Sequence, residues 1–214
     1  MKIIRPQTDA CMLLQQPFKT VVEQAAQNEE TLAKIEVDGQ QTVRCIAPQV
    51  EIKHSIFTGC RLAESDFCKA YFADVTFKNC DFSGTNFTDA TFKRVEFIGC
   101  KLIGADFSGS FLEDMWWEQC NASYMNFSQC RVRNIGFDSC GLQNGFFNDM
   151  RMKECAFNTC SLSNAQFMHT PCKGIDFTTS DISGVQFTAE DLRGGIFTAL
   201  QACDLALLLG IHIK

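Results

Sequence analysis

The sequence predicts a repeat protein of the solenoid class, built from units of five residues. Two periodicities in the 214-residue chain indicate this. An apolar residue, most often phenylalanine, occupies every fifth position from Ile52 to Phe197 without an insertion. Cysteine also recurs at intervals of twenty residues from Cys60 to Cys160. Neither interval matches the helical period of about 3.6 residues or the strand period of about 2, and a fixed period over such a length indicates a repeat architecture.

Unit centres that lie twenty residues apart form four columns. Two columns are aromatic throughout, whereas the other two are mostly aliphatic. We expect the aromatic columns to form the ladder of the hydrophobic core, in which each buried phenylalanine contributes about 1.5–3 kcal/mol. The two aromatic columns are Phe57, Phe77, Phe97, Trp117, Phe137, Phe157, Phe177 and Phe197, and Phe67, Phe87, Phe107, Phe127, Phe147, Phe167 and Phe187.

The units resemble the A(D/N)LXX repeat of the pentapeptide-repeat proteins. The units that match well are CDFSG at 80–84, TNFTD at 85–89, ADFSG at 105–109, MNFSQ at 125–129 and SDISG at 180–184. The resemblance implies an all-β fold, a right-handed quadrilateral parallel β-helix in which four pentapeptides make one square coil. Five residues then form one side of the square, and twenty return the chain to the same side one coil further on. We expect this β-helix over residues 50–199, with the two aromatic columns on opposite sides.

Residues 1–49 lie outside the repeat frame and are expected to form an N-terminal capping segment. Residues 18–35 have helical composition, and residues 34–45 resemble a short hairpin around Asp38-Gly39. A solenoid needs such a cap because an open end exposes its core and its unpaired backbone groups. A separate binding element is the alternative.

The C-terminal segment, residues 200–214, is expected to mediate dimerisation. Residues 199–209 suit a short apolar helix with Gly210 as its C-cap, followed by an extended tail over 211–213. A helix that is apolar on most sides is buried against something, and a second copy of the chain is the expected partner. The predicted dimerisation residues are Leu205, Leu207, Leu208, Leu209, Ile211 and Ile213.

This segment resembles the C-terminal dimerisation segment of the Qnr-type and related gyrase-protecting pentapeptide proteins. The resemblance rests on Gln201-Ala202, the leucines and the run from Gly210 to Ile213. It implies a tail-to-tail dimer whose acidic surface imitates duplex DNA, binds DNA gyrase or topoisomerase IV, and counters quinolone-like poisons. Two features depart from that group, because loops do not interrupt this frame and residues 1–49 do not resemble its N-termini. A pentapeptide scaffold for other protein–protein interactions is the alternative function.

Outward positions beside the two aromatic columns carry acidic residues, which we predict to contact the partner. An acidic surface can dock on a basic saddle by electrostatic steering; the alternative is that these carboxylates are only solvated. The predicted acidic contacts are Asp66, Asp89, Glu96, Asp106, Glu118, Asp138, Asp149 and Asp176. The side centred on Phe72 to Leu192 is instead basic, with Lys93, Arg94, Arg131, Arg133, Arg151, Lys153, Lys173 and Arg193.

Two aromatic residues, Phe111 and Trp116, lie one place before unit centres and should point outward. Because exposed aromatic residues are enriched at recognition surfaces, both are predicted as partner contacts. The alternative is that these wide side chains pack against the N-terminal segment where it folds back.

The thirteen cysteines are expected to be small inward-facing apolar residues, with neither disulfides nor bound metal. No C-x-x-C occurs, whereas zinc sites need closely spaced ligand pairs that converge on one point. The chain also has no nucleophile elbow, phosphate-binding loop or H-E-x-x-H motif, and only three histidines. We therefore expect no enzymatic activity, no cofactor and no small-molecule substrate, since a filled core leaves no ligand pocket.

Composition excludes other classes of function. The formal net charge of −6 argues against direct binding of nucleic acid through a basic surface. No run of 18 apolar residues exists that could span a membrane. The opening residues lack the apolar core and cleavage site of a signal peptide, so a cytoplasmic location is expected.

Overall fold

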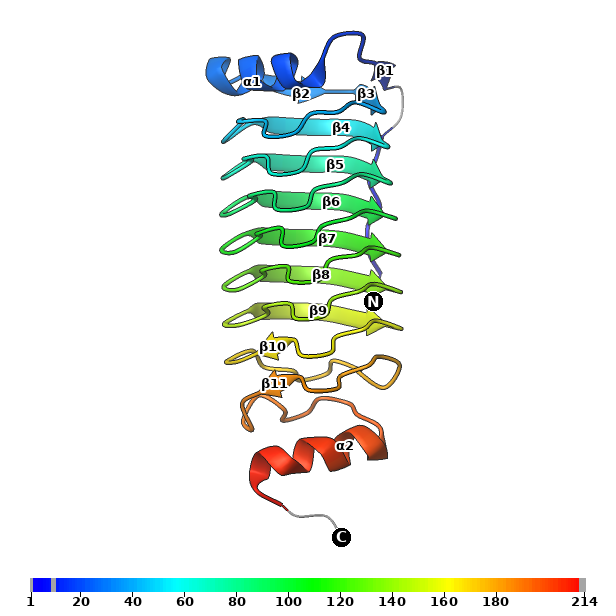
Figure 1. Ribbon diagram of the computed structural model, residues 1–214, viewed down its shortest axis with the longest axis vertical. Helices are drawn as coiled ribbons and strands as arrows, with labels where there is room; N and C mark the ends of the chain where they lie inside the picture. Colours follow the sequence, from blue (N-terminus) through cyan, green and yellow to red (C-terminus); the bar gives the residue numbers. More distant parts are fainter. Residues whose placement is uncertain (1, 9–10, 212–214) are drawn as a thin grey trace.

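The computed structural model describes residues 2–8 and 11–211 and has the shape of a rod made of stacked square coils, with a helix across each end (Figure 1). The predicted fold, a right-handed quadrilateral parallel β-helix, is confirmed. Consecutive coils pair in parallel, and each residue pairs with the one twenty positions later, as Phe77 does with Phe97. Among the described residues, no helix is long and apolar enough to cross a membrane.

One long strand per coil forms the main sheet, whose order is β1-β3-β4-β5-β6-β7-β8-β9, with β2 also paired to β4. Each strand from β4 to β9 has eight residues and continues around one corner of the square. These strands are β4 (Glu51–Thr58), β5 (Tyr71–Lys78), β6 (Thr91–Ile98), β7 (Phe111–Glu118), β8 (Arg131–Asp138) and β9 (Arg151–Asn158). Further on, the short strands β10 (Gln166–Phe167) and β11 (Gln186–Phe187) pair with each other.

A left-handed backbone conformation turns most corners of the square. In these units the residue two places after the centre has a positive φ, for example 65° at Gly84 and 57° at Asp89. Glycine adopts this conformation at little cost, and asparagine and aspartate adopt it more readily than other residues. The recurrence of Gly, Asn and Asp at this position therefore follows from the need to turn the chain every five residues.

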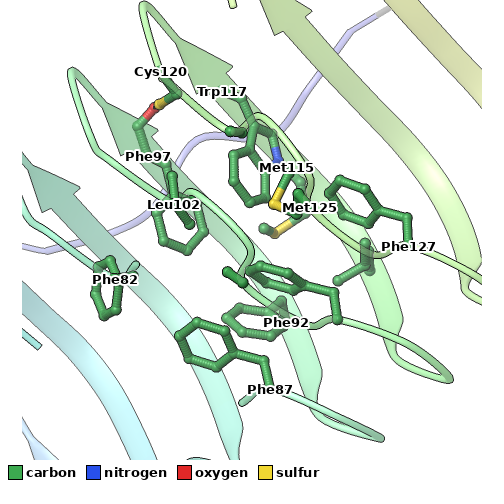
Figure 2. Packing of buried hydrophobic residues seen from close by; sticks show 14 of the residues in the cluster. Phe82, Phe87, Phe92, Phe97, Leu102, Met115, Trp117, Cys120, Met125 and Phe127 are labelled. Atoms are coloured by element: carbon green, nitrogen blue, oxygen red, sulfur yellow. The ribbon is translucent and has the colours of Figure 1, made fainter. Parts of the chain in front are cut away.

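The aromatic columns form the continuous core of the rod (Figure 2). Rings of successive coils stack with centroids 4.9 Å apart for Phe77 and Phe97 and 4.3 Å apart for Phe97 and Trp117. Rings from the two columns meet edge to face, as Phe107 and Trp117 do at 5.5 Å. All residues of the predicted ladder are buried except Phe197, which is half-buried at the C-terminal end.

The β-helix begins one coil earlier than the sequence indicated, and the predicted hairpin around Asp38-Gly39 is wrong. Strands β2 (Thr31–Ala33) and β3 (Ile35–Asp38) both pair in parallel with β4 instead of with each other. The five-residue frame does extend back through Leu32, Val37, Thr42 and Ala47, but a polar centre and a small one obscure it. The structure buries Thr42, Val37 and Ala47 in the first coil.

A helix covers the N-terminal end of the core. Helix α1 (Phe18–Asn28) follows the short strand β1 (Met12–Leu13) and lies across the first coil (Figure 1). It buries Phe18, Val22 and Ala25, and the Phe18 ring meets Phe57 edge to face at 5.1 Å. The helix is shorter than the predicted region 18–35 because Thr31 begins the first coil.

The C-terminal end carries helix α2 (Ala199–Ala206), which continues as the 3-10 turn η1 (Leu207–Leu209). Thr198 caps α2 by accepting a hydrogen bond from the Gln201 N–H at 3.2 Å. The Gln201 amide in turn donates to the carbonyl oxygens of Phe177 and Ser180, each at 2.9 Å, and so fixes the helix to the last coils. Gly210, with φ 70°, caps the turn as predicted.

The cysteines at intervals of twenty face the interior, and the thiols from Cys60 to Cys120 donate to backbone carbonyls of the preceding coil, as Cys120 does to Phe97 at 3.3 Å. In a parallel column, burial raises the pKa of the Cys130 thiol to about 12. The thiolate is the reactive species, so Cys130 should react slowly in the folded protein, and the column from Cys60 to Cys160 should do so because a bulky reagent does not reach buried sulfur atoms. Cys203 is exposed, and Cys11, Cys68 and Cys155 are half-buried.

We therefore expect a bulky maleimide to label Cys203 of the native protein first and to spare the column from Cys60 to Cys160, with all thirteen cysteines labelled only after unfolding. Mass spectrometry of the labelled peptides measures this order, and elemental analysis of the same sample should find no zinc. Rapid labelling of the column, or one equivalent of metal, would contradict a purely structural role.

Candidate interaction surface

The structure distributes the eight predicted acidic contacts over two opposite sides of the rod. We call these the Phe67 side and the Phe77 side, after residues at their unit centres. The Phe67 side carries Asp66, Asp89, Asp106 and Asp149, and the Phe77 side carries Glu96, Glu118, Asp138 and Asp176. The eight residues therefore do not form one continuous acidic surface.

Several of these carboxylates stabilise their own repeat unit. Asp66 accepts a hydrogen bond from the Cys68 N–H at 3.0 Å, and Asp106 accepts one from the Ser108 N–H at 2.8 Å. At Asp176, bonds from the hydroxyl and the N–H of Thr178 hold the pKa of the carboxyl below its ordinary value. Aspartate and asparagine form such turns with the backbone two residues on, so the acid at this repeat position is partly structural.

The Phe77 side contains carboxylates that no neighbouring cation neutralises. Glu118 and Asp138 are direct partners in the register of β7 and β8, and neither forms an ion pair with a described residue. Like charges directly opposite each other on adjacent strands destabilise a sheet. Glu96, on the preceding coil, is paired with Arg5 at 2.6 Å. These three residues lie on three successive coils of the Phe77 side, and we call them the acidic row.

The N-terminal segment packs against Trp116, which was the alternative to an exposed partner contact at this residue. The side chain is half-buried and lies in the space that Gly136 leaves open, where an added Cβ would be 2.5 Å from the indole ring. The Arg5 guanidinium lies 4.7 Å from the centroid of the ring, and the indole N–H donates to Glu118 at 3.1 Å. Phe111, by contrast, is 39% exposed.

The covering segment is residues 2–7, which we call the N-terminal strap. It runs along the side of the rod past several coils (Figure 1) and contacts polar side chains at one corner of the square. Sequence reasoning missed this corner. One feature of the sequence could have indicated it. The corner position favours glycine because its φ is positive, yet none of the five residues there is glycine: His54, Asp74, Arg94, Asp114 and Asn134.

The basic side, centred on Phe72 to Leu192, differs between its two halves. Near the middle of the rod Glu113 pairs with Lys93 at 3.4 Å and with Arg133 at 3.1 Å. Further on, the register places Arg131 beside Arg151. Both arginines are exposed, and neither forms an ion pair with a described residue. The rod therefore presents opposite charge on adjacent sides.

The C-terminal segment leaves an apolar surface at the end of the rod. Leu207 and Leu208 are 63% and 46% exposed, Ile211 is also exposed, and Leu205 packs against the core. Leu200, which the sequence analysis did not include, is 76% exposed. The side chain of Leu209 and the whole of Ile213 lie outside the part of the chain that the structure describes.

Solved structures with similar folds include QnrB1, described as a plasmid-mediated fluoroquinolone resistance protein. The two chains are 21% identical with a TM-score of 0.53, and the alignment covers 86% of this chain and 98% of QnrB1. HetL, a pentapeptide repeat protein involved in heterocyst differentiation regulation in the cyanobacterium Nostoc, is 10% identical with a TM-score of 0.30; the alignment covers 78% of this chain and 86% of HetL. At 21% identity the likeness to QnrB1 shows the fold alone.

A search of curated protein sequences finds no significant match to this chain. The family model for the pentapeptide repeat region, however, matches residues 50–115 and 90–167, which together make up more than half of the chain. The matched residues lie within the five-residue frame, which forms the corners and the stacked ring columns described above. The chain therefore belongs to the pentapeptide-repeat family.

Proposed function

We propose that this protein is a dimeric, DNA-mimicking interaction protein that binds DNA gyrase or topoisomerase IV and protects the enzyme from quinolone-like poisons. Three observations support the proposal. The chain belongs to the pentapeptide-repeat family. Its C-terminal segment resembles the dimerisation segment of the gyrase-protecting group. QnrB1, a plasmid-mediated fluoroquinolone resistance protein, has a similar fold over nearly its whole length.

The acidic row on the Phe77 side is the observation that carries the proposal. Glu118 and Asp138 repel each other across adjacent strands without a compensating cation, and this arrangement costs stability unless a partner supplies positive charge. Coils lie about 4.8 Å apart, whereas duplex DNA carries one charge per about 1.7 Å. The rod is therefore a sparse imitation of DNA, and steering toward a basic cleft matters more than matching each phosphate.

The exposed apolar end supports the dimer. Leu200, Leu207 and Leu208 are exposed around α2 and η1, where a second copy would cover them. A twofold axis at this end presents two acidic rows to a twofold-symmetric, DNA-binding enzyme. Two linked contacts raise avidity by about 10²–10⁴ over one.

The test is a supercoiling assay with purified gyrase, a quinolone and increasing amounts of the protein. We expect the wild-type protein to restore supercoiling at a quinolone concentration that inhibits gyrase alone. The double variant Glu118→Gln with Asp138→Asn should need roughly a hundredfold more protein, since two charged hydrogen bonds are lost and each is worth about tenfold in affinity.

A matched control removes the same charge far from the acidic row, by changing Glu29→Gln and Glu30→Gln at the end of α1. We expect this control to protect like the wild type. Absence of protection at any concentration would favour the scaffold function, and equal loss in both variants would show that only net charge matters.

A further inference from the structure

The N-terminal strap binds the rod mainly through its backbone. Its N–H and C=O groups pair with side chains from successive coils at one corner, so the strap advances along the rod as an extended chain. The bonds are Asn134 Nδ2 to the Lys2 oxygen at 2.8 Å, the Ile4 N–H to Asp114 Oδ1 at 3.3 Å, the Gln7 N–H to Asp74 Oδ1 at 3.1 Å, and His54 Nδ1 with the Gln7 oxygen at 3.0 Å.

The side chains that receive the strap stand at strained backbone positions. We call His54, Asp74, Arg94, Asp114 and Asn134 the corner column; all five have a positive φ, between 48° and 61°. The next corner along the chain carries glycine at Gly39, Gly59 and Gly99. The left-handed region penalises residues with a Cβ, and four of the five side chains placed there at that cost bond the strap.

The side chain of Arg5 makes a contact with the rod that favours a positively charged residue at this point of the strap. The Arg5 guanidinium donates to Glu96 at 2.6 Å and lies over the face of the Trp116 ring. A cation over an indole face is attracted by the ring quadrupole, and the carboxylate adds a charge-assisted hydrogen bond. Any occupant of the corner column is therefore favoured when it places Lys or Arg at this point.

The corner column contains carboxylates that need an occupant. Asp74 and Asp114 are buried. Burial alone would raise the pKa of Asp74, but hydrogen bonds from Arg94 and the Gln7 N–H, with the charges of Arg94 and His54, hold it below its ordinary value. Asp114 bonds only to the Ile4 N–H and the Asn134 amide among the described residues. Removing the strap would take one donor from each of these buried carboxylates and leave Asp114 with the Asn134 amide as its one donor among the described residues, which is costly.

The strap lies on the surface of the rod. None of the residues 2–8 is buried, and the Arg5 side chain is half exposed. Most of the strap's contacts are backbone hydrogen bonds, which another extended segment can form equally well. The corner column is more stable when a segment is bound to it, and the strap has no buried residue that anchors it there. We therefore expect another segment to replace the strap more readily than the column is left empty.

We propose that the corner column, with Glu96 and Trp116, is a docking site for an extended peptide segment that carries a cation, and that a segment of a partner protein replaces the strap there. Recognition is through the backbone and tolerates many sequences, apart from the Lys or Arg over Trp116. This surface goes beyond the proposed function, because it takes a cationic protein segment whatever the rod's main partner is.

The test uses the full chain with Ile4→Pro, which removes the N–H that bonds Asp114, and Arg5→Ala, which removes the cation. Both changes lie in the strap and leave the corner column intact. The probe is a fluorescein-labelled peptide with the sequence of residues 2–8, and its binding is followed by fluorescence anisotropy. Tryptophan emission reports release of the strap from Trp116, and circular dichroism confirms that the β-helix is folded.

We expect the emission of the strap variant to shift to the red and to return when the peptide binds. The variant should bind the peptide at least about tenfold more tightly than the wild type does, because the tethered strap competes at an effective concentration of about millimolar. Arg5→Glu in the peptide, or Glu96→Gln added to the strap variant, should each weaken binding by about tenfold.

Unchanged tryptophan emission in the strap variant would overturn the proposal, because the named contacts would not hold the strap. Failure of the peptide to bind the variant, or equal binding of the Arg5→Glu peptide, would also overturn it. The assay contains no gyrase, so its failure is distinguishable from failure of the proposed function.

Discussion

Replacing Phe127 with alanine is expected to lower the free energy of unfolding by about 3–5 kcal/mol. Phe127 lies fully buried in the middle of the rod. Its ring stacks between Phe107 at 5.3 Å and Phe147 at 5.4 Å, and it meets Trp117 and Phe137 edge to face, each at 5.8 Å. The truncation leaves a cavity that the coils above and below cannot close, because backbone pairing fixes their separation.

The matched control is Ser128→Ala, at the next residue. The Ser128 side chain points outward and its hydroxyl forms no hydrogen bond that the structure records, so the change should be within about 0.5 kcal/mol. Urea titrations of the wild type and both variants, followed by circular dichroism, measure the difference. Equal midpoints for the two variants would contradict the assigned register.

Replacing Leu208 with aspartate is expected to convert a dimer into a folded monomer with much weaker protection of gyrase. The Leu208 side chain is 46% exposed on the single chain, so aspartate there should leave the β-helix intact. In the proposed dimer the same position is covered, where an unpaired carboxylate opposes association. Loss of the second contact should reduce protection by a factor of about 10²–10⁴.

Light scattering of the wild type and the variant measures assembly, and the supercoiling assay measures protection. Val43→Asp, at an exposed apolar position near the other end of the rod, is the control and should remain dimeric. A monomeric wild type would contradict the predicted assembly. A monomeric Leu208→Asp protein with full protection would show that two linked contacts are unnecessary.

The repeat frame was predictable because packing imposes it on every unit. Every unit centre from Ile52 to Phe197 is apolar and no insertion interrupts the coils, so the register is visible in the sequence. The first coil was missed for the same reason, since the buried centre Thr42 breaks the apolar pattern. The strands of this coil pair in parallel with the next coil, and a local turn motif such as Asp38-Gly39 carries no information about that pairing.

The N-terminal strap could not be predicted from a periodic pattern. It has no repeat, and its bonds join residues far apart in the chain, such as Ile4 with Asp114. The same contacts explain why Trp116 is covered although its repeat position points outward. The role of the predicted acidic residues could not be read from the repeat frame, because the sequence does not distinguish a carboxylate that bonds its own turn, such as Asp66, from an unpaired one, such as Glu118.

The claim that the rod takes the place of DNA is tested most directly by competition for the enzyme. Labelled protein is bound to purified gyrase, and unlabelled duplex DNA is added while fluorescence anisotropy is recorded. The account predicts that duplex DNA displaces the protein, that added salt weakens the complex because the contact is between opposite charges, and that the Glu118→Gln, Asp138→Asn variant is displaced at lower DNA concentrations. A complex that retains the protein at saturating DNA, or no complex with gyrase at all, would contradict it.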